Sequence, residues 1–210
     1  MGDVAHERII DLYQRTAHSF DEARSRTLFE APWLDGFLAE LPERPRVLDI
    51  GCGSGEPIAQ YLIERGASVT GVDAAEPMIE LCRKRFPDHE WLVADMRTLD
   101  LGRQFDGVIA WHSAFHLRPR EQRRMFARYA AHLVPGGALM FTSGPEHGER
   151  IGEWQGEPLY SASLAPDEYR ALLARNGFTL LDHRLEDETC GGATVWLAQM
   201  IPASGLDGSA

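Results

Sequence analysis

One short segment constrains the fold of this chain more than any other: Val47-Leu48-Asp49-Ile50 followed by Gly51-Cys52-Gly53-Ser54-Gly55. A short β-type run ends here in three alternating glycines. Glycines let the chain turn tightly and remove side chains, so a ligand can lie against the backbone. Such a turn at the carboxyl edge of a sheet is typical of nucleotide-binding α/β folds. A tight turn without a ligand is the less favoured interpretation, because three glycines carry an entropy cost.

Strand and helix patterns alternate after this loop. Predicted strands and helices follow one another at 68–72 (strand), 76–86 (helix), 90–94 (strand), 105–111 (strand), 119–133 (helix) and 137–143 (strand). This alternation predicts a doubly wound α/β domain with a mostly parallel sheet. An irregular segment is expected from Gly144 to about Tyr160, then a helix over 166–176. Two strands at 178–186 and 193–200, with no helix between them, predict an antiparallel pair at one edge.

Two carboxylates end predicted strands near the glycine loop. Asp73 follows Gly51 by 22 residues, at the tip of the next strand, where it can accept both hydroxyls of a ribose. A helix N-cap is the alternative role for Asp73. Asp95 ends the third strand and can accept a hydrogen bond from an exocyclic amine, while Met96 can cover a purine ring. Together they indicate an adenosine-type ligand.

Five motifs resemble those of the class I S-adenosylmethionine (SAM)-dependent methyltransferases, in that family's order and spacing from about Arg46 to Ser143. They are VLDIGCGSG, VTGVDAAEPMIELCRKRF, VADM, FDGVIAWHSAFHL and LVPGGALMFTS. The resemblance implies a Rossmann-like methyltransferase fold, with a seven-stranded sheet whose last strand is antiparallel. It also implies transfer of a methyl group from SAM to an acceptor, leaving S-adenosylhomocysteine (SAH).

The resemblance also assigns cofactor contacts. The glycine loop, including Cys52, would face the methionine part of SAM, with Asp49 and Trp111 near its amino end. Asp73 would hold the ribose and Asp95 the adenine amine. The adenine would be bordered by Ala74, Met78 and Met96, and the lid would close with Tyr13 and Phe20.

Other nucleotide-binding classes fit less well. A Rossmann dehydrogenase needs GxGxxG, but here the third glycine comes one position early and Glu56 takes its place. An acid beside a pyrophosphate is unfavourable, which argues against NAD or FAD. A non-catalytic SAM-binding regulator or partner protein is the main alternative. An aminopropyl transferase would need an acidic cleft that the sequence does not show.

Methyl transfer from a sulfonium needs alignment of the two reactants more than a dedicated catalytic group. His112 and His116 are the candidates for a general base if the acceptor requires one. They lack the HExxH pattern and a third ligand, so no metal is expected. Tentative acceptor contacts are Phe115, Trp154 and Tyr160, and the absence of an Asn/Asp-Pro-Pro-Tyr run disfavours base and glutamine methylation. A small-molecule acceptor is expected.

Composition bounds the partners and the location. The chain has 210 residues, 44% of them hydrophobic, and a net charge of −11, which opposes binding to long nucleic acid. Three widely spaced cysteines indicate reduced thiols, and no apolar run is long enough for a membrane span. We expect a cytoplasmic monomer or homodimer. The expected divisions are lid helices over 1–45, a SAM-binding domain over 46–202 and a flexible tail over 203–210.

Overall fold

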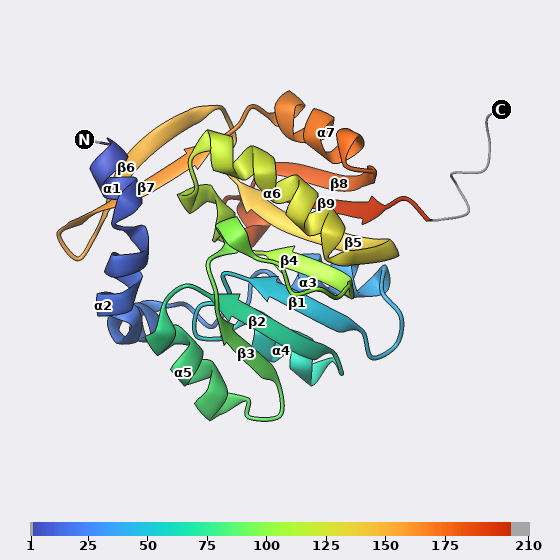
Figure 1. Cartoon of the computed structure of the whole chain (residues 1–210), viewed down its shortest axis with the longest axis horizontal. Coiled ribbons are helices and arrows are strands. Elements are labelled where there is room, and N and C mark those ends of the chain that lie inside the picture. The colour runs from blue at the N-terminus through green and yellow to red at the C-terminus, as the bar shows by residue number, and fades with distance from the viewer. Residues whose placement is uncertain (1, 203–210) are drawn as a thin grey trace.

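A seven-stranded sheet, in the order β3-β2-β1-β4-β5-β9-β8, forms the centre of the computed structural model (Figure 1). The structure describes residues 2–202, with only the backbone for residues 2–4. The predicted tail, 203–210, lies outside the described residues. The strands are β1 (Arg46–Ile50), β2 (Ser68–Asp73), β3 (Glu90–Val93), β4 (Phe105–Ala110), β5 (Leu133–Ser143), β8 (Phe178–Asp187) and β9 (Ala193–Met200).

The strand order reverses between β1 and β4. The chain runs outward from β1 to β2 and β3, then returns to add β4 and β5 on the other side, and all these neighbours pair in parallel. The last strand, β9, is antiparallel to both β5 and β8, which confirms the predicted fold. Ligands of open α/β sheets bind at such a reversal, outside the carboxyl ends of the strands.

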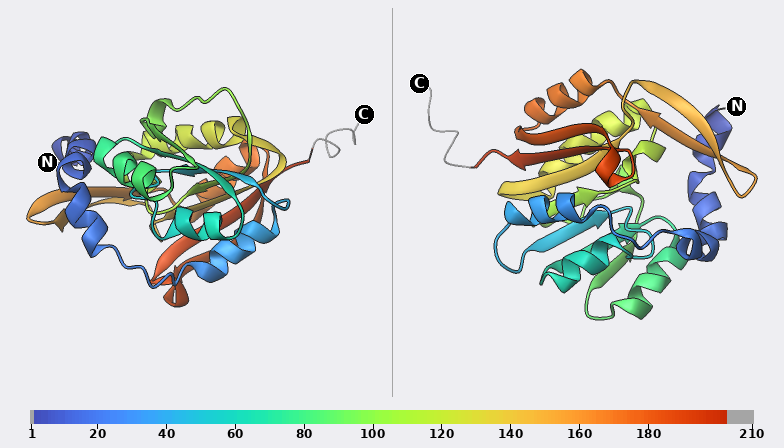
Figure 2. Two further views of the ribbon diagram at one scale, coloured as in Figure 1. Left: turned by 90° about the horizontal axis from the view of Figure 1, so that it is seen from below. Right: turned by 180° about the vertical axis from the view of Figure 1, so that it is seen from behind.

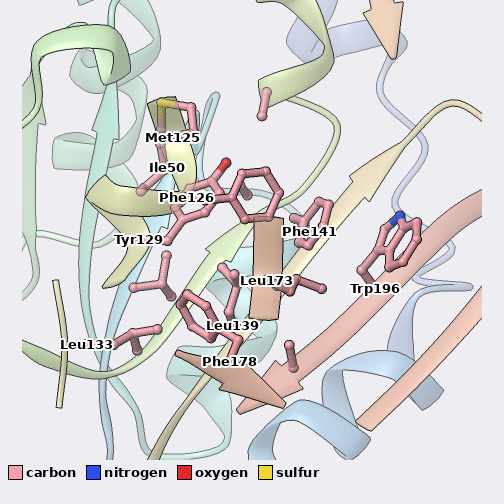
Figure 3. Close-up of a cluster of buried hydrophobic side chains, with 14 of the residues drawn as sticks. Ile50, Met125, Phe126, Tyr129, Leu133, Leu139, Phe141, Leu173, Phe178 and Trp196 are labelled. Carbon is pink, nitrogen blue, oxygen red and sulfur yellow. The ribbon is translucent and has the colours of Figure 1, made fainter. Parts of the chain in front are cut away.

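Helices cover both faces of the sheet because the strands are apolar on both sides. In β1, Val47 faces one core cluster and Leu48 the other, as expected from the alternation of side chains along a strand. One face packs against α3 (Ala31–Ala39), α4 (Ile58–Glu64) and α5 (Glu76–Arg85), and the other packs against α6 (Pro119–Ala131) and α7 (Pro166–Arg175). Figure 3 shows the second cluster, where Phe126, Phe141 and Trp196 meet.

The segment after β5 is a β-hairpin, so the prediction of an irregular segment from Gly144 to Tyr160 is wrong. Its strands are β6 (Gly148–Trp154) and β7 (Glu157–Ser163), joined by a tight turn in which Gln155 and Gly156 have φ values of 51° and 82°. Most of β6 is exposed, so it lacks the apolar alternation that identifies a half-buried strand. Backbone pairing with β7 forms the hairpin although the β6 sequence shows no apolar alternation.

The N-terminal helices divide between two locations. In α3, Trp33, Leu34 and Phe37 are buried in the core against the sheet. In contrast, α1 (Gly2–Glu7) and α2 (Ile9–Ala23) lie beside the hairpin (Figures 1 and 2). The carboxyl ends of the parallel strands point toward this side of the molecule (Figure 1). The predicted lid role therefore concerns α1 and α2 alone. Within residues 2–202, no helix combines the length and apolar character needed to cross a membrane.

Candidate functional site

A cleft lies at the carboxyl ends of β1, β2, β3 and β4, with α1 and α2 as its outer wall. The space in and around it that no atom fills is about 880 Å³, which includes open solvent at the mouth. Predicted site residues that line it are Tyr13, Phe20, Gly51, Gly53, Asp73, Ala74, Met78, Asp95, Met96, His112 and His116. Residues from five separate parts of the sequence thus meet in one place.

The glycine loop forms the floor of the cleft. The N–H groups of Gly51 and Cys52 both donate to the Val72 carbonyl, at 2.8 and 3.0 Å, which ties the loop to the end of β2. A side chain at Gly51 would put its Cβ 2.3 Å from the Cβ of Ser113, whereas a Cβ on Gly53 would meet nothing within 4 Å. The backbone at Gly53 is therefore open to a ligand.

Asp73 connects the loop to the neighbouring strand. Its Oδ2 accepts from the Gly53 N–H at 3.0 Å, and its Oδ1 accepts from the Ala75 N–H at 2.8 Å. The N-cap of α5 is Ala75 and has no side-chain cap, so the N-cap alternative for Asp73 is wrong. The ribose contact of Asp73 stays a prediction. Burial raises the pKa of Asp73.

The Asp95 carboxylate accepts hydrogen bonds from its neighbour Arg97. The guanidinium Nε lies 3.0 and 2.9 Å from the two carboxylate oxygens, Nη2 lies 2.6 Å from Oδ2, and the Arg97 N–H donates to Oδ1 at 2.9 Å. Met96 and the buried Met78 lie along the same cleft and provide apolar walls for a flat ring.

A second hollow adjoins the glycine loop and contains the remaining predicted cofactor contacts, Asp49, Cys52 and Trp111. Asp49 is 2% exposed, and its Oδ2 has no hydrogen-bond partner. Burial, and then the nearby charge of Asp73, raise the pKa of Asp49 to about 7. Arg24 lines the same hollow and is anchored by Glu30, at 3.2 Å. The Asp49 carboxyl group and the Arg24 guanidinium therefore line the same hollow.

His116 is fixed by two hydrogen bonds. Its Nδ1 donates to the Tyr160 carbonyl at 2.7 Å, because a carbonyl can only accept. Its Nε2 is therefore the acceptor for the Tyr13 hydroxyl, at 3.0 Å. Burial lowers the pKa of His116 to about 4 and, with the charge of Asp73, raises the pKa of Tyr13 to about 12. The pair is neutral at pH 7 and joins α2 to the loop after β4.

His112 has a left-handed backbone, with φ of 49°, and borders both hollows. The Thr142 hydroxyl accepts from the His112 N–H at 2.8 Å and lies 3.3 Å from Nδ1. Because Thr142 is buried, its own proton needs an acceptor, and Nδ1 provides one. The neutral ring then carries its proton on Nε2. Burial lowers the pKa of His112 to about 4, so neither imidazole offers a free basic nitrogen.

The three tentative acceptor residues do not line the cleft. Trp154 packs edge-on against Phe20, with ring centroids 5.6 Å apart, and Tyr160 packs against His6 at 5.3 Å. Phe115 packs against His116, at 4.7 Å, behind the cleft. All three support residues that border the cleft, and their predicted contact with an acceptor stays a prediction.

The segment that carries most of the cleft residues is similar to a known protein family. A family profile described as "Methyltransferase domain" matches residues 47–137, which carry the glycine loop, Asp73, Asp95 and both histidines. Residues 47–137 thus match a methyltransferase domain. The resemblance drawn from the five motifs is thereby confirmed.

The curated relatives of this chain include an N-methyltransferase and an O-methyltransferase. The chain is 35% identical over 101 residues to dTDP-3-amino-3,4,6-trideoxy-alpha-D-glucopyranose N,N-dimethyltransferase of Streptomyces venezuelae, covering 47% of this chain and 42% of that protein. It is 29% identical over 151 residues to an O-methyltransferase of Pyrenophora dematioidea, covering 65% and 55%. The chain thus spans about half the length of these curated relatives.

A solved methyltransferase matches nearly the entire chain. The 1,6-didemethyltoxoflavin-N1-methyltransferase of Burkholderia thailandensis superposes with a TM-score of 0.75 over 96% of this chain and 91% of that one, at 21% identity. At that identity the likeness establishes the shared fold alone.

Several residues that line the two hollows were missed from sequence. They include His6, Ile9, Ile10, Arg24, Arg97, Ser113 and Leu117. Arg97 was detectable, since it follows the VADM motif directly. The others come from α1, α2 and the loop after β4, and no local pattern gives their distance from the glycine loop. Among residues 2–202, no group of three His, Cys, Asp or Glu side chains is placed to hold a metal ion.

Proposed function

We propose that this protein is a SAM-dependent methyltransferase acting on a small organic acceptor. The main support is the hydrogen bond from the Gly53 N–H to the Asp73 carboxylate, together with the open space above Gly53. That arrangement combines a ribose acceptor with a cradle that has room for a nucleoside.

The residues of the cleft fit the two halves of SAM. Asp73 takes the ribose hydroxyls, and the adenine lies between the Met78 and Met96 sides of the cleft. In the adjoining hollow, Asp49 holds the α-ammonium through its unpartnered Oδ2, and Arg24 holds the α-carboxylate through its guanidinium. A buried carboxyl without a partner is costly, and a bound cation removes that cost.

SAM would supply a methyl group bound to a positively charged sulfur. The acceptor attacks the methyl carbon in line with the sulfur, and SAH leaves as a neutral thioether. The contribution of the protein is alignment and exclusion of water. The lid helices α1 and α2 provide the exclusion, with Tyr13 bonded to His116 and Phe20 packed on Trp154. Since both imidazoles lack a free basic nitrogen, the acceptor reacts as an already deprotonated amine, or after Tyr13 leaves His116.

We propose a small acceptor because side-chain contacts join α2 to the hairpin beside the cleft. Arg15 forms a two-bond ion pair with Glu157, at 2.5 and 2.7 Å, and Ser19 donates to Gln155 at 3.1 Å. Two relatives support this class, because one acts on a dTDP-amino sugar and the other on a didemethyltoxoflavin. Acidic charge and three free cysteines favour a cytoplasmic protein that does not bind long nucleic acid.

The test is methyl transfer itself. The purified protein is incubated with SAM and panels of amino sugars, heteroaromatic amines and phenols, and SAH formation is measured by mass spectrometry. We expect acceptor-dependent SAH from at least one panel, abolished by Asp73→Ala. SAH binding without turnover on every panel would instead favour the non-catalytic SAM-binding alternative.

A further inference from the structure

We propose that His112 determines which acceptor atom is methylated: its Nε2–H donates a hydrogen bond to an ionised oxygen of the acceptor, and that oxygen takes the methyl group. The inference rests on the proposed function and narrows its acceptor class to phenolates and carboxylates. It requires no general base in the protein, because such acceptors lose their proton to water before the transfer.

His112 lies where the two hollows of the site meet. The sulfur of SAM joins the nucleoside to the methionine part, so in the proposed complex it lies between the cleft and the adjoining hollow. Four residues of the described chain border both spaces, namely Phe20, Gly51, Gly53 and His112. Two of them are glycines and one is a phenylalanine. His112 is therefore the only one of the four that brings a hydrogen-bonding side chain to the methyl group.

The backbone and the surrounding side chains fix the orientation of the His112 ring. Its φ of 49° lies in the left-handed region, which side chains rarely adopt and which is common at functional sites. The His112 N–H donates to the Thr142 hydroxyl at 2.8 Å, and the same hydroxyl lies 3.3 Å from Nδ1. The ring also packs against Trp111 and Phe115, with ring centroids 5.4 and 5.8 Å apart. These contacts restrict rotation of the ring.

Nε2 is the free hydrogen-bond donor of this ring. Because Nδ1 accepts from Thr142, the proton of the neutral ring is on Nε2. Within residues 2–202, Nε2 makes no hydrogen bond, and, unlike the buried indole nitrogen of Trp111, it keeps access to the hollow. Burial lowers the pKa of His112 to about 4, so at pH 7 the ring donates a proton in a hydrogen bond and does not remove one.

A donor beside the methyl group favours an oxygen nucleophile over an amine. An amine nitrogen has a single lone pair, which must attack the methyl carbon and so cannot accept from Nε2–H. An ionised oxygen has further lone pairs, and a hydrogen bond to its charge is a strong one. As the oxygen–carbon bond forms, the carbon–sulfur bond breaks and its electron pair stays on sulfur. A negative oxygen and a positive sulfonium thus give a neutral ether or ester and neutral SAH.

The experiment identifies the methylated atom and measures the rate. The purified protein and SAM are incubated with aminophenols, which offer both nucleophiles in one molecule, and with separate panels of phenols, aromatic carboxylic acids and amines. Products are assigned by mass spectrometry and NMR, and SAH affinity is measured by calorimetry. We expect transfer to oxygen, and the phenol and carboxylate panels distinguish the two sources of that oxygen.

Variants of His112 test the role of Nε2. His112→Phe keeps a ring but removes both nitrogens, so kcat/KM for transfer to oxygen should fall about 10- to 100-fold while SAH affinity stays unchanged. His112→Gln has an amide N–H that can reach the position of Nε2, so it should recover part of the rate. The matched control is His147→Phe, an exposed histidine before β6 that borders neither hollow, which should keep the full rate.

The outcomes separate the two proposals. If the unaltered protein binds no SAH, or binds it and methylates nothing in any panel, the proposed function fails. If methyl transfer occurs only to nitrogen, or if His112→Phe methylates oxygen at the unaltered rate, the function stands and the role of His112 is refuted. A loss of SAH affinity in His112→Phe that accounts for its whole loss of rate would also refute that role, because it would place His112 on the cofactor.

Discussion

Asp73 is the residue on which cofactor binding depends most directly. Asp73→Asn keeps the size of the side chain but removes the charge and one acceptor. We expect SAH affinity to fall about 10- to 100-fold, because hydrogen bonds to charged groups contribute about 1.5–3 kcal/mol. Calorimetry measures the change. Asp88→Asn, an exposed site in the turn before β3, is the control and should bind normally; equal affinity for both variants would refute the ribose contact.

Asp49 makes SAH affinity depend on pH. Its pKa is about 7 in the ligand-free protein, so the carboxylate that holds the α-ammonium is fully formed only above that value. Affinity should therefore rise between pH 6 and 7.5, and Asp49→Asn should remove most of this rise. A titration series by calorimetry tests it, and an unchanged pH slope in the variant would contradict the assignment.

The same shift has the opposite effect on stability. The pKa of Asp49 is raised above its ordinary value of 3.8, so the folded state favours the neutral carboxyl. That contribution is present below pH 3.8 and is lost as the pH rises to about 7. In denaturant unfolding without ligand, Asp49→Asn should therefore gain stability relative to the unaltered protein as the pH increases over this range.

Two glycines of the loop, Gly51 and Gly53, differ in the space around them. Gly51→Ala must accept φ of 75° and a Cβ 2.3 Å from Ser113, whereas Gly53→Ala has φ of 54° and free space. We expect Gly51→Ala to lose about 3 kcal/mol of unfolding free energy, and Gly53→Ala about 1 kcal/mol. Gly53→Ala should nevertheless bind SAH more weakly, since its methyl group occupies the cradle. Similar stability losses in both variants would contradict this geometry.

Docking of α2 depends on the hydrogen bond from Tyr13 to His116. Tyr13→Phe leaves the buried Nε2 of His116 without a donor, so we expect a loss of about 1–3 kcal/mol in denaturant unfolding. The matched control is Tyr61→Phe, whose hydroxyl donates to the half-exposed Asp35 at 2.7 Å. Water can replace that bond, so its loss should stay below about 1 kcal/mol. Equal losses would show that the lid contact does not contribute to stability.

At the scale of the whole molecule, a ligand that bridges the lid and the sheet should stabilise the fold as one unit. SAH at 100 times its dissociation constant adds about 2.7 kcal/mol. For a chain of this size, that corresponds to a rise in melting temperature of about 5–10 °C. NAD at the same concentration should give no shift, because the loop lacks the GxGxxG spacing. A melting curve that NAD shifts as much as SAH would overturn the cofactor assignment.

Much of the molecule was predictable because its signals are local. The glycine run from Gly51 directly follows a short β-type run, and strand and helix periods predict the element order from Arg46 onward. Asp73 and Asp95 were placed at strand tips by that order alone. The hairpin after β5 was missed because β6 is exposed, so its sequence carries no apolar alternation.

Sequence alone determined the sheet, the glycine loop and the family, since each follows from short-range patterns of side-chain size and polarity. Tertiary structure alone decided which nitrogen of His116 carries a proton. It also decided that Arg97 donates hydrogen bonds to Asp95 and that His6 lines the cleft. Those properties depend on atoms brought together from distant parts of the chain. Hydrogen bonding and burial act over a few ångströms of space, whatever the separation in sequence.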